Sequence, residues 1–305
     1  MKISKILKGK NYSLSFEVFP PKTSSSFESV REATEKIAAL SPSYMSVTYG
    51  AGGGTSKYTL DIAKNIQEKY NVPTLAHLTC VSSSKETVRE RIADIKAAGI
   101  KNVMALRGDI PEGMEDTPRD YKYAIELIRE LRESGGDFCI GGACYPEGHP
   151  ESPSLESDIR YLKEKMDAGL DFLTTQMFFD FDPFFKFMVR ASRADIDTSR
   201  IIPGIMPITS VSQVERVVKL SGCRLPKEFT DMIDKYGQDP EIMKIAGMNY
   251  AIHQILTMFQ NGFKNVHVYS MNKPDVATEI FNYISDTLEY NGKNSLHKKL
   301  QSPKN

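Results

Sequence analysis

The sequence has no excess charge of either sign, no long apolar run and no secretion signal. Lysine and arginine together number 39, as do aspartate and glutamate, so the net charge calls for neither nucleic acid nor an anionic membrane as a partner. The longest apolar stretches are far below the roughly 20 residues that cross a membrane. The basic N-terminus lacks the apolar segment of a signal peptide. We therefore expect a cytoplasmic protein.

The sequence is also poor in residues arranged as metal ligands. None of its four cysteines belongs to a C-x-x-C pair, so we expect buried, reduced thiols rather than disulfides, zinc or an iron–sulfur cluster within this chain. His77 has no second histidine or carboxylate at ligand spacing. The sequence thus predicts no metal site. The cysteines are Cys80, Cys139, Cys144 and Cys223.

What the chain does contain is a regular alternation of short apolar segments and helical patterns. Apolar residues recur at three- and four-residue spacing over residues 27–40, 58–70, 85–98, 121–133, 155–168 and 211–220. The first six strand–helix units repeat about every 30 residues, which is typical of parallel strands joined by helical crossovers. Eight strand-like segments begin near Leu14, Tyr44, Thr74, Asn102, Phe138, Asp171, Arg200 and Asn265.

The last gap between strand segments is longer than the others. Residues 208–264 hold two or three helical patterns, and a final helix is expected from residue 275 to about residue 288. Eight strand–helix units in this length predict an α/β fold, a (β/α)₈ TIM barrel with extra helices before the last strand. We expect a single domain over residues 1–290 and a disordered polar tail over residues 291–305.

A doubly wound open sheet is the alternative arrangement of the same elements. Two observations favour the barrel. No G-x-G-x-x-G sequence follows the first strand segment, as a dinucleotide-binding sheet would require. Polar residues also gather at the C-terminal ends of the strand segments, which is where barrels build their sites.

Several strand segments carry a polar residue where a half-buried strand should carry an apolar one. Side chains of a strand alternate between two faces, so Phe16 and Val18 share one face while Glu17 lies on the other. Burying such groups without partners would cost about 1–3 kcal/mol each. The set therefore indicates a binding site. Its other members are Thr48, His77, Arg107, Asp109 and Gln176.

Glu17 and Arg107 have two interpretations each. An enclosed carboxylate has a raised pKa unless it is paired, which suits a general acid near neutral pH. A salt bridge inside the barrel, for example from Glu17 to Arg107, explains the same residue equally well. Arg107 can hold a phosphate bidentately, with Gly108 allowing a planar ligand to approach closely, but a turn with a surface ion pair is the simpler interpretation.

The remaining polar residues carry weaker signals. The glycine-rich stretch 50–55 can cradle a phosphate at a helix N-terminus, although such stretches are more often plain loops. His149 lies in a stiff turn between a glycine and a proline, where a histidine is usually a hydrogen-bonded loop residue. Gln176 can both donate and accept, which suits reading the edge of a heterocycle. Asp180 can cap the helix that follows it.

Eight short motifs occur in the order of the strand segments, and together they resemble the bacterial type of the methylenetetrahydrofolate reductase family over about residues 12–288. That family is a (β/α)₈ flavoprotein, so the resemblance implies FAD along the C-terminal ends of the strands. It further implies that NADH or NADPH reduces the flavin, which then reduces 5,10-methylenetetrahydrofolate to 5-methyltetrahydrofolate. The motifs are SFEVFPPK, SVTYGAGGGT, AHLTC, ALRGD, AxYPEGHPE, TTQMFFD, PGIMPI and HVYSMNKP.

The resemblance implies roles for individual residues. Glu17 matches the general acid that protonates the departing nitrogen as the folate ring opens, and Asp109 matches a carboxylate that tunes the flavin and stabilises the folate cation. Gln176 matches an amide that contacts folate and nicotinamide in turn. Gln213 and Lys273 match folate contacts. The positions matched to FAD are Thr48, Tyr49, Ala51, His77, Arg107, Gly108, Asp109, Tyr145, His149, Asp158 and Lys165.

Four positions depart from the family pattern. Tyr161 and Glu164 stand where the family has an asparagine and an arginine that help to hold FAD, and Glu164 cannot pair with a phosphate. Val217 stands where the family has a phenylalanine that stacks on substrate, which leaves the nicotinamide site open. Lys273 replaces an arginine that reaches the glutamate tail of folate, so the charge is kept while the bidentate fork is lost.

Three hypotheses follow for the function. The first is a flavin-dependent folate reductase, expected as a homo-oligomer. The second is a pterin-binding barrel that transfers methyl groups without redox chemistry and needs no flavin. The third is a flavin subunit that is reduced only through an iron–sulfur partner subunit, as in some relatives. Flavin content separates the first hypothesis from the second, and reduction by NADH alone separates the first from the third.

Overall fold

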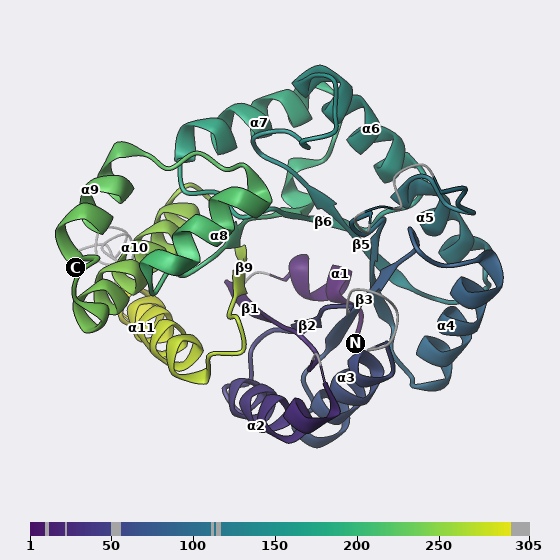
Figure 1. The fold of residues 1–305 in the computed structure, drawn as a ribbon, viewed down its shortest axis with the longest axis horizontal. Coiled ribbons are helices and arrows are strands. Elements are labelled where there is room, and N and C mark those ends of the chain that lie inside the picture. The colour runs from purple at the N-terminus through teal and green to yellow at the C-terminus, as the bar shows by residue number, and fades with distance from the viewer. Residues whose placement is uncertain (10–11, 22, 50–55, 111–112, 114–116, 294–305) are drawn as a thin grey trace, which may run out of the picture.

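Parallel strands form a ring that the helices surround (Figure 1). The computed structural model describes residues 1–9, 12–21, 23–49, 56–110, 113 and 117–293. The strands of these residues are β1 (Ser13–Val18), β2 (Met45–Val47), β3 (Thr74–Thr79), β4 (Asn102–Leu106), β5 (Cys139–Cys144), β6 (Phe172–Thr175), β7 (Ile201–Ile202), β8 (Gly204–Ile205) and β9 (Asn265–Tyr269). Their order in the sheet is β7-β6-β5-β4-β3-β2-β1-β9-β8, and each neighbouring pair is parallel.

The ring closes at Pro203, which separates the two end strands of the sheet. Ile201–Ile202 pairs with β6, whereas Gly204–Ile205 pairs with β9. Proline has no backbone N–H for a ladder, so the seventh strand segment is divided in two at this residue. The carbonyl oxygen of Pro203 instead accepts from the backbone nitrogen of His267 at 2.9 Å. One strand segment thereby joins both ends of the sheet, and the predicted (β/α)₈ barrel is confirmed.

Helices cover the outside of the ring and end close to where the sequence places them. Ser84, Ser154 and Asp180 cap three of them by accepting from backbone N–H groups two or three residues on. The capping role predicted for Asp180 is therefore confirmed. The helices of the described residues are α1 (Ile3–Leu7), α2 (Phe27–Ala38), α3 (Ser56–Tyr70), α4 (Lys85–Ala97), α5 (Ala124–Glu133), α6 (Leu155–Asp167), α7 (Phe181–Arg193), α8 (Val211–Ser221), α9 (Lys227–Tyr236), α10 (Pro240–Gln260) and α11 (Pro274–Lys293), with 3₁₀ turns at Ser24–Ser26 and Thr198–Arg200.

The last helix is longer than predicted. The sequence suggested an end near residue 288 and a disordered tail from residue 291, but α11 continues to Lys293. The first three residues of the predicted tail are therefore helical, and the rest of it, residues 294–305, lies outside the described residues. A helix can continue into polar residues when the apolar face of its other turns packs against the protein. The polar composition of residues 291–293 therefore did not exclude a helix there.

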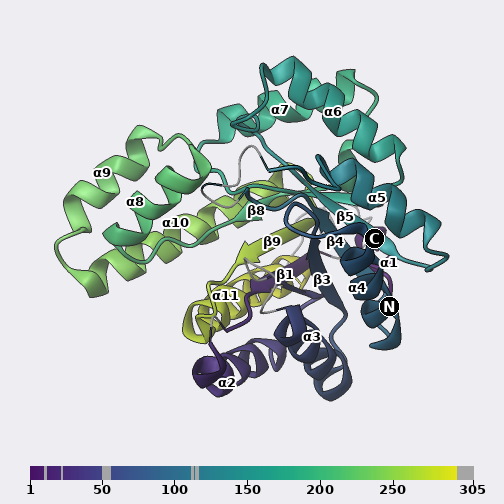
Figure 2. The same ribbon diagram turned by 45° about the vertical axis from the view of Figure 1, so that its right-hand side comes forward.

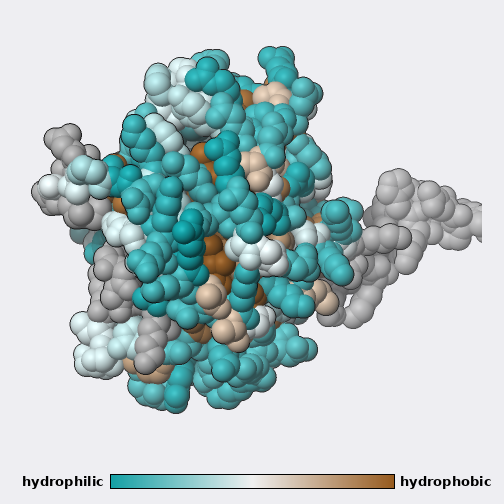
Figure 3. Space-filling view, turned by 90° about the vertical axis from the view of Figure 1, so that its right-hand side faces the viewer, coloured by the Kyte–Doolittle hydropathy of each residue, from teal (hydrophilic) through white to brown (hydrophobic). Residues whose placement is uncertain are grey.

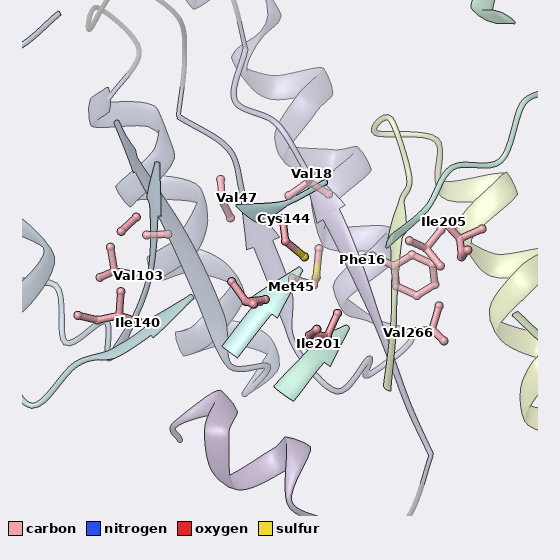
Figure 4. Packing of buried hydrophobic residues seen from close by; sticks show 14 of the residues in the cluster. Phe16, Val18, Met45, Val47, Val103, Ile140, Cys144, Ile201, Ile205 and Val266 are labelled. Atoms are coloured by element: carbon pink, nitrogen blue, oxygen red, sulfur yellow. The ribbon is translucent and has the colours of Figure 1, made fainter. Parts of the chain in front are cut away.

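The outer face of the ring packs against the helices, as the alternation of side chains predicts. Phe16 and Val18 of β1 are fully buried in the main apolar cluster, together with Val47 of β2 and Val266 of β9 (Figure 4). Burying a side chain of this size stabilises the fold by about 1.5–3 kcal/mol. The residues between them, such as Glu17, are left to face the inside of the ring. All four cysteines are buried and free, as predicted.

A short helix that the sequence did not predict closes the N-terminal end of the barrel. In Figure 1, which looks down the ring, α1 lies inside the circle of strands. Ile3 is fully buried there, and its backbone nitrogen donates to Oδ1 of Asn102 at 2.8 Å. The apolar floor therefore leaves the polar inner residues nearer the opposite, C-terminal end. The floor cluster around Ile3 consists of Tyr44, Leu75, Met104, Cys139, Phe172 and Ile202.

The extra helices before the last strand form an extension at one side of the barrel (Figure 2). They enclose a second apolar cluster that includes Phe229 of α9 and Met243 of α10. Gly247 allows α10 to lie directly on the barrel, because a Cβ atom there would be only 1.6 Å from the carbonyl oxygen of Ile208. The extension is thus fixed against the chain segment that leaves β8 at the C-terminal end.

The opposite side of the molecule is a solvent-facing layer of helices. The side on the right of Figure 1 is mostly hydrophilic, with hydrophobic residues in small groups (Figure 3). The helices α4 and α5 are joined there by an ion pair from Nε of Arg89 to Oε1 of Glu130 at 2.6 Å. These features indicate helices that meet water on one face and the barrel on the other.

Candidate active site

Glu17 lies at the centre of the polar inner face. It is on β1 between Ser46 of β2 and Tyr269 of β9, with which it is in register. Its Oε2 atom accepts from Oγ of Ser46 at 3.2 Å and lies 3.5 Å from Nε2 of His77 and 3.8 Å from Nε2 of His267. The neighbours of this carboxylate are thus two imidazoles and a hydroxyl.

His267 joins Glu17 to a buried hydrogen-bond network. The Nδ1 atom of His267 lies 2.8 Å from Oγ of Ser15, and its Nε2 atom lies 3.1 Å from Oγ of Ser46. Its ring is only 1% exposed and stacks on that of Tyr44, with ring centroids 5.6 Å apart. Both ring nitrogens are therefore engaged, and the imidazole is held in one orientation beside the carboxylate.

This environment sets the charge of Glu17 differently from what the sequence suggested. Burial by itself raises the pKa of the Glu17 carboxyl, but its interactions with His267, His77 and Ser46 outweigh the burial, so the pKa lies below its ordinary value. The raised pKa suggested for an unpaired carboxylate does not apply, because this carboxylate has partners inside the barrel. The suggested partner Arg107 was wrong, since Arg107 pairs with another residue. Burial lowers the pKa of His77.

Arg107 directly follows β4 and makes a bidentate ion pair with Glu151. Its Nη1 atom donates to Oε2 of Glu151 at 2.5 Å, and its Nη2 atom donates to Oε1 at 2.6 Å. Gly108 follows with φ of +87°, and a Cβ atom there would lie 3.0 Å from Cβ of Thr79. The ion pair in a turn, the simpler of the two interpretations of Arg107, is what the structure contains.

Asp109 is exposed and lies beside this ion pair rather than in the network around Glu17. The pKa of Arg107 is raised chiefly by its bond to Glu151, and that of Tyr145 chiefly by burial. The negative charge of Asp109 adds to the rise of both pKa values. No hydrogen bond or ion pair joins Asp109 to Glu17 within the described ranges. The structure thus separates the two predicted catalytic residues into an inner group and a rim group.

The loop after β5 brings three predicted cofactor positions together. The rings of Tyr145 and His149 meet edge to face, with centroids 4.6 Å apart. Asp158 of α6 holds the loop, because its carboxylate accepts from the backbone nitrogen of His149 at 3.3 Å and from Oγ of Ser152 at 2.9 Å. Asp158 therefore has a structural partner for each carboxylate oxygen.

Lys165 of α6 points back toward the barrel. Its Nζ atom donates to the carbonyl oxygen of Ala143 at 2.9 Å, and burial lowers the pKa of the ammonium. Among the residues that the structure describes, no carboxylate lies within ion-pair distance of it. A largely desolvated cation without an anion is stabilised by any anionic ligand that reaches it.

Thr48 and Tyr49 follow β2 at the same end of the barrel. The backbone nitrogen of Thr48 donates to the carbonyl oxygen of Val18 at 2.9 Å, and its own carbonyl oxygen accepts from Oγ1 of Thr59 at 2.9 Å. Tyr49 packs against the outer apolar cluster. Ala51 and the glycine-rich stretch 50–55 lie outside the described residues.

The three predicted substrate residues fall into two places. Gln176 follows β6, and its backbone nitrogen donates to the carbonyl oxygen of Cys144 at 2.7 Å. Gln213 and Lys273 meet at Thr209, because Oε1 of Gln213 accepts from the Thr209 nitrogen at 3.1 Å and Nζ of Lys273 donates to Oγ1 of Thr209 at 2.6 Å. The loops after β8 and β9 are thereby joined. Gln213 and Lys273, which are both predicted folate contacts, lie at the same place.

The departures from the family pattern have different structural settings. Tyr161 is exposed on α6 and lies under the guanidinium of Arg160, 5.1 Å from the ring centroid. Glu164 is exposed on the same helix. Val217 is only 4% exposed and belongs to the apolar cluster of the helical extension. The residue at position 217 therefore packs in the core of the helical extension.

Sequence reasoning missed two residues of this site. The period of two that singled out Glu17 also places His267 on the inner face of β9, between Val266 and Val268. That signal was available and unused. Glu151 gave no such signal, since nothing in its local sequence indicates that it pairs with an arginine 44 residues earlier.

The residues present fit a flavin dinucleotide. Lys165 is a cation without an anionic partner in the described chain, and Arg107 presents a fork that matches phosphate. The Nε2 atom of His77 is buried and has no hydrogen-bond partner among the described residues. Gly108 has a positive φ, and a Cβ atom there would lie 3.0 Å from Cβ of Thr79 and 3.3 Å from Cγ1 of Val81, so this turn requires glycine. These cations and spare donors are what a diphosphate joined to a planar heterocycle requires.

Comparison with known proteins agrees with this geometry. The sequence pattern of the family described as "Methylenetetrahydrofolate reductase" matches residues 2–285. The chain is 36% identical over 267 residues to 5,10-methylenetetrahydrofolate reductase of Pectobacterium carotovorum subsp. carotovorum, with 88% of each chain covered. The chain belongs to the methylenetetrahydrofolate reductase family. The resemblance carried by the eight motifs is therefore confirmed.

Two further similarities extend the comparison. Methylenetetrahydrofolate reductase (NADH) 1 of Arabidopsis thaliana is 34% identical over 284 residues, which cover 89% of this chain and 48% of that one. A solved Clostridium thermocellum protein, described as binding two copies of 5-methyl-5,6,7,8-tetrahydrofolic acid, superposes with a TM-score of 0.62 at 13% identity, covering 93% of this chain and 99% of the other. The structural likeness supports the barrel fold.

Family membership makes the protein an oxidoreductase of folate one-carbon metabolism, and the methylenetetrahydrofolate reductase family implies a flavin cofactor. Within the described ranges, no helix is both long and apolar enough to cross a bilayer. Within the same ranges, no three histidine, cysteine, aspartate or glutamate side chains are grouped as metal ligands.

Proposed function

We propose that the protein reduces 5,10-methylenetetrahydrofolate to 5-methyltetrahydrofolate with FAD as cofactor and a reduced nicotinamide as electron donor. The observation that carries this proposal is Glu17, a largely buried carboxylate inside the barrel that is surrounded by proton-carrying groups. Such a group has no evident structural use on the inner face of a strand, whereas proton transfer to a bound ligand requires it.

Glu17 acts as the general acid that protonates the departing nitrogen of the folate ring. The pKa of the carboxyl lies below its ordinary value in the unliganded protein, so Glu17 takes up its proton only when a ligand is bound. A ligand that covers the group removes water and favours the neutral acid. His267 is held by Ser15 and Ser46, so the imidazole beside the carboxylate keeps one orientation.

Arg107 and Lys165 would hold the two phosphates of FAD, and Gly108, which has no side chain, would let the cofactor approach the backbone. Tyr145 and His149 form the wall of this region, which Asp158 supports from below through the loop backbone. When bound, the flavin supplies hydride transfer between the nicotinamide and the folate.

The folate is held from two sides. Gln176 reads the edge of the pterin, since its side-chain nitrogen has no hydrogen-bond acceptor among the described residues while its oxygen accepts from the backbone of Met177 at 3.1 Å. Lys273 receives the glutamate tail as a point charge, with Gln213 fixing Thr209 beside it. Asp109 contributes negative charge at the rim, where it stabilises a cationic folate.

NADH is the donor that we favour, with NADPH as the alternative of the same chemistry. The name of the Arabidopsis relative includes NADH, which supports this choice. A flavin subunit that is reduced only by an iron–sulfur partner, as in some relatives, is the alternative that the departure at Val217 keeps open.

The proposal is tested by the flavin and its reduction. We expect purified protein to be yellow, to release FAD on denaturation, and to be bleached by NADH under argon and reoxidised by methylenetetrahydrofolate, as followed by rapid-mixing absorbance. Colourless protein that cannot be reconstituted with FAD would favour the methyl-transferring barrel. Bleaching by an artificial dye but by neither NADH nor NADPH would favour the partner-dependent subunit.

A further inference from the structure

Three of the five N–H groups of Arg107 are engaged by groups of the protein itself. Glu151 takes two of its N–H groups at 2.5 and 2.6 Å, and Nε donates to the carbonyl oxygen of Gly108 at 3.1 Å. Two parallel N–H to oxygen bonds are also the geometry in which a guanidinium binds phosphate. The carboxylate of Glu151 thus stands where a phosphate group would bind.

The two partners of this ion pair differ in how firmly they are held. The side chain of Arg107 is 17% exposed, whereas that of Glu151 is 56% exposed. The backbone nitrogen of Glu151 donates to Nδ1 of His149 at 3.1 Å, so the main chain is fixed while the carboxylate reaches outward. Glu151 can therefore turn into solvent while Arg107 remains in place.

The comparison with Lys165 shows that the pairing is selective. Both cations match positions that bind FAD, yet Lys165 contacts only a backbone carbonyl group among its described partners. Of these two cations, only Arg107 is paired with a carboxylate among the described residues. The charge of Asp109 acts on Arg107, and that of Arg119 acts on Glu151. An exposed ion pair is weak, so a diphosphate can displace Glu151 from Arg107. Breaking the ion pair between Arg107 and Glu151 nevertheless costs free energy, which weakens the binding of the diphosphate.

We propose that Glu151 is an internal anion that holds the guanidinium of Arg107 until a phosphate group of the cofactor replaces it, and that it thereby limits the affinity of the protein for FAD. This inference rests on the proposed function. Glu151 acts through Arg107 and does not touch the reacting atoms, so it is a specificity-determining residue of the cofactor site. A flavin without phosphate does not compete with Glu151.

The experiment compares FAD binding to flavin-free wild type, E151Q, R107Q and the double variant by quenching of flavin fluorescence. We expect the dissociation constant of E151Q to be about fivefold lower than that of wild type, because no ion pair has to break. R107Q binds more weakly, and adding E151Q to R107Q brings no gain. E156Q is the matched control, since it removes an exposed carboxylate from the first turn of α6, and it should stay within about twofold of wild type.

Riboflavin, which lacks phosphate, serves as the second probe and should bind wild type and E151Q equally. Unchanged or weaker FAD binding by E151Q overturns the inference while leaving the proposed function in place, as does an equal gain in the R107Q background. A wild-type protein that binds no FAD overturns the proposed function and this inference together.

Discussion

At the scale of single residues, the site depends on partners that the chain brings in from distant positions. Glu17 is surrounded by Ser46, His77 and His267, which come from three other strands. A carboxylate alone on the inner face would be raised in pKa by burial, whereas this one is kept ionised by its neighbours. The charge of the residue is thus a property of the assembled group.

Replacing Glu17 by glutamine tests its role as the acid. We expect E17Q to bind FAD and to be reduced by NADH at the wild-type rate, because neither step needs the proton. Reduction of methylenetetrahydrofolate should fall by about 10²–10⁴-fold in rapid-mixing experiments, since glutamine cannot protonate the departing nitrogen.

The control for E17Q is E32Q, which changes an exposed glutamate of α2 and should behave as wild type in both half-reactions. Normal folate turnover by E17Q would remove Glu17 from the acid role. Loss of flavin reduction as well would indicate that the carboxylate holds the site together rather than donating a proton.

At the scale of elements, the floor of the barrel is formed by α1. Ile3 fills the end of the ring beneath Phe172 and Met104, so shortening it to alanine leaves a cavity. We expect I3A to lower the free energy of unfolding by about 2–4 kcal/mol in urea denaturation. K5A, on the exposed side of the same helix, should change it by less than about 0.5 kcal/mol. Equal stability of I3A and K5A would show that α1 does not close the barrel.

The helices α2 and α3 are joined through Glu35, which gives a pH-dependent contribution. Lys69, Asn65 and Tyr70 of α3 bond to its carboxylate and lower its pKa to about 2. A lowered carboxyl pKa stabilises the fold above the unfolded value, which is near 4.5, and this stabilisation is lost as the pH falls toward about 2.

We therefore expect E35Q to be less stable than wild type at pH 7 by at most about 1 kcal/mol, because the ion pair to Lys69 is half-exposed. The difference should shrink as the pH falls below 4.5 in thermal melts recorded by circular dichroism. E32Q is the control on the same helix. A constant difference at every pH would contradict the assignment.

At the scale of the whole molecule, the closed ring predicts that the described chain unfolds as one cooperative unit. β1 pairs with β9, so residues near the two ends of the sequence form adjacent strands, and neither half of the chain can keep its core alone. We expect one unfolding transition, with ellipticity and tyrosine fluorescence changing together. Saturating FAD should raise the transition temperature, because ligand binding to the folded state adds about 2.7 kcal/mol at 100 times its dissociation constant.

Two separate transitions would contradict a single domain over residues 1–290. Sedimentation equilibrium on the same samples tests the predicted homo-oligomer, for which we expect a mass that is a multiple of 34.2 kDa. Since oligomers unfold at temperatures that depend on concentration, the melts should be repeated at two protein concentrations.

The amino-acid sequence by itself determined the alternation of strands and helices, the faces of each strand and the residues that face inward, because these follow from local periodicity. Glu17, His77 and Gln176 could be singled out in this way. The tertiary structure alone decided the division of the seventh strand at Pro203, the floor made by α1 and the pairing of Arg107 with Glu151. Those features join residues far apart in the chain, and the energy of a contact between distant residues leaves no periodic trace in the sequence.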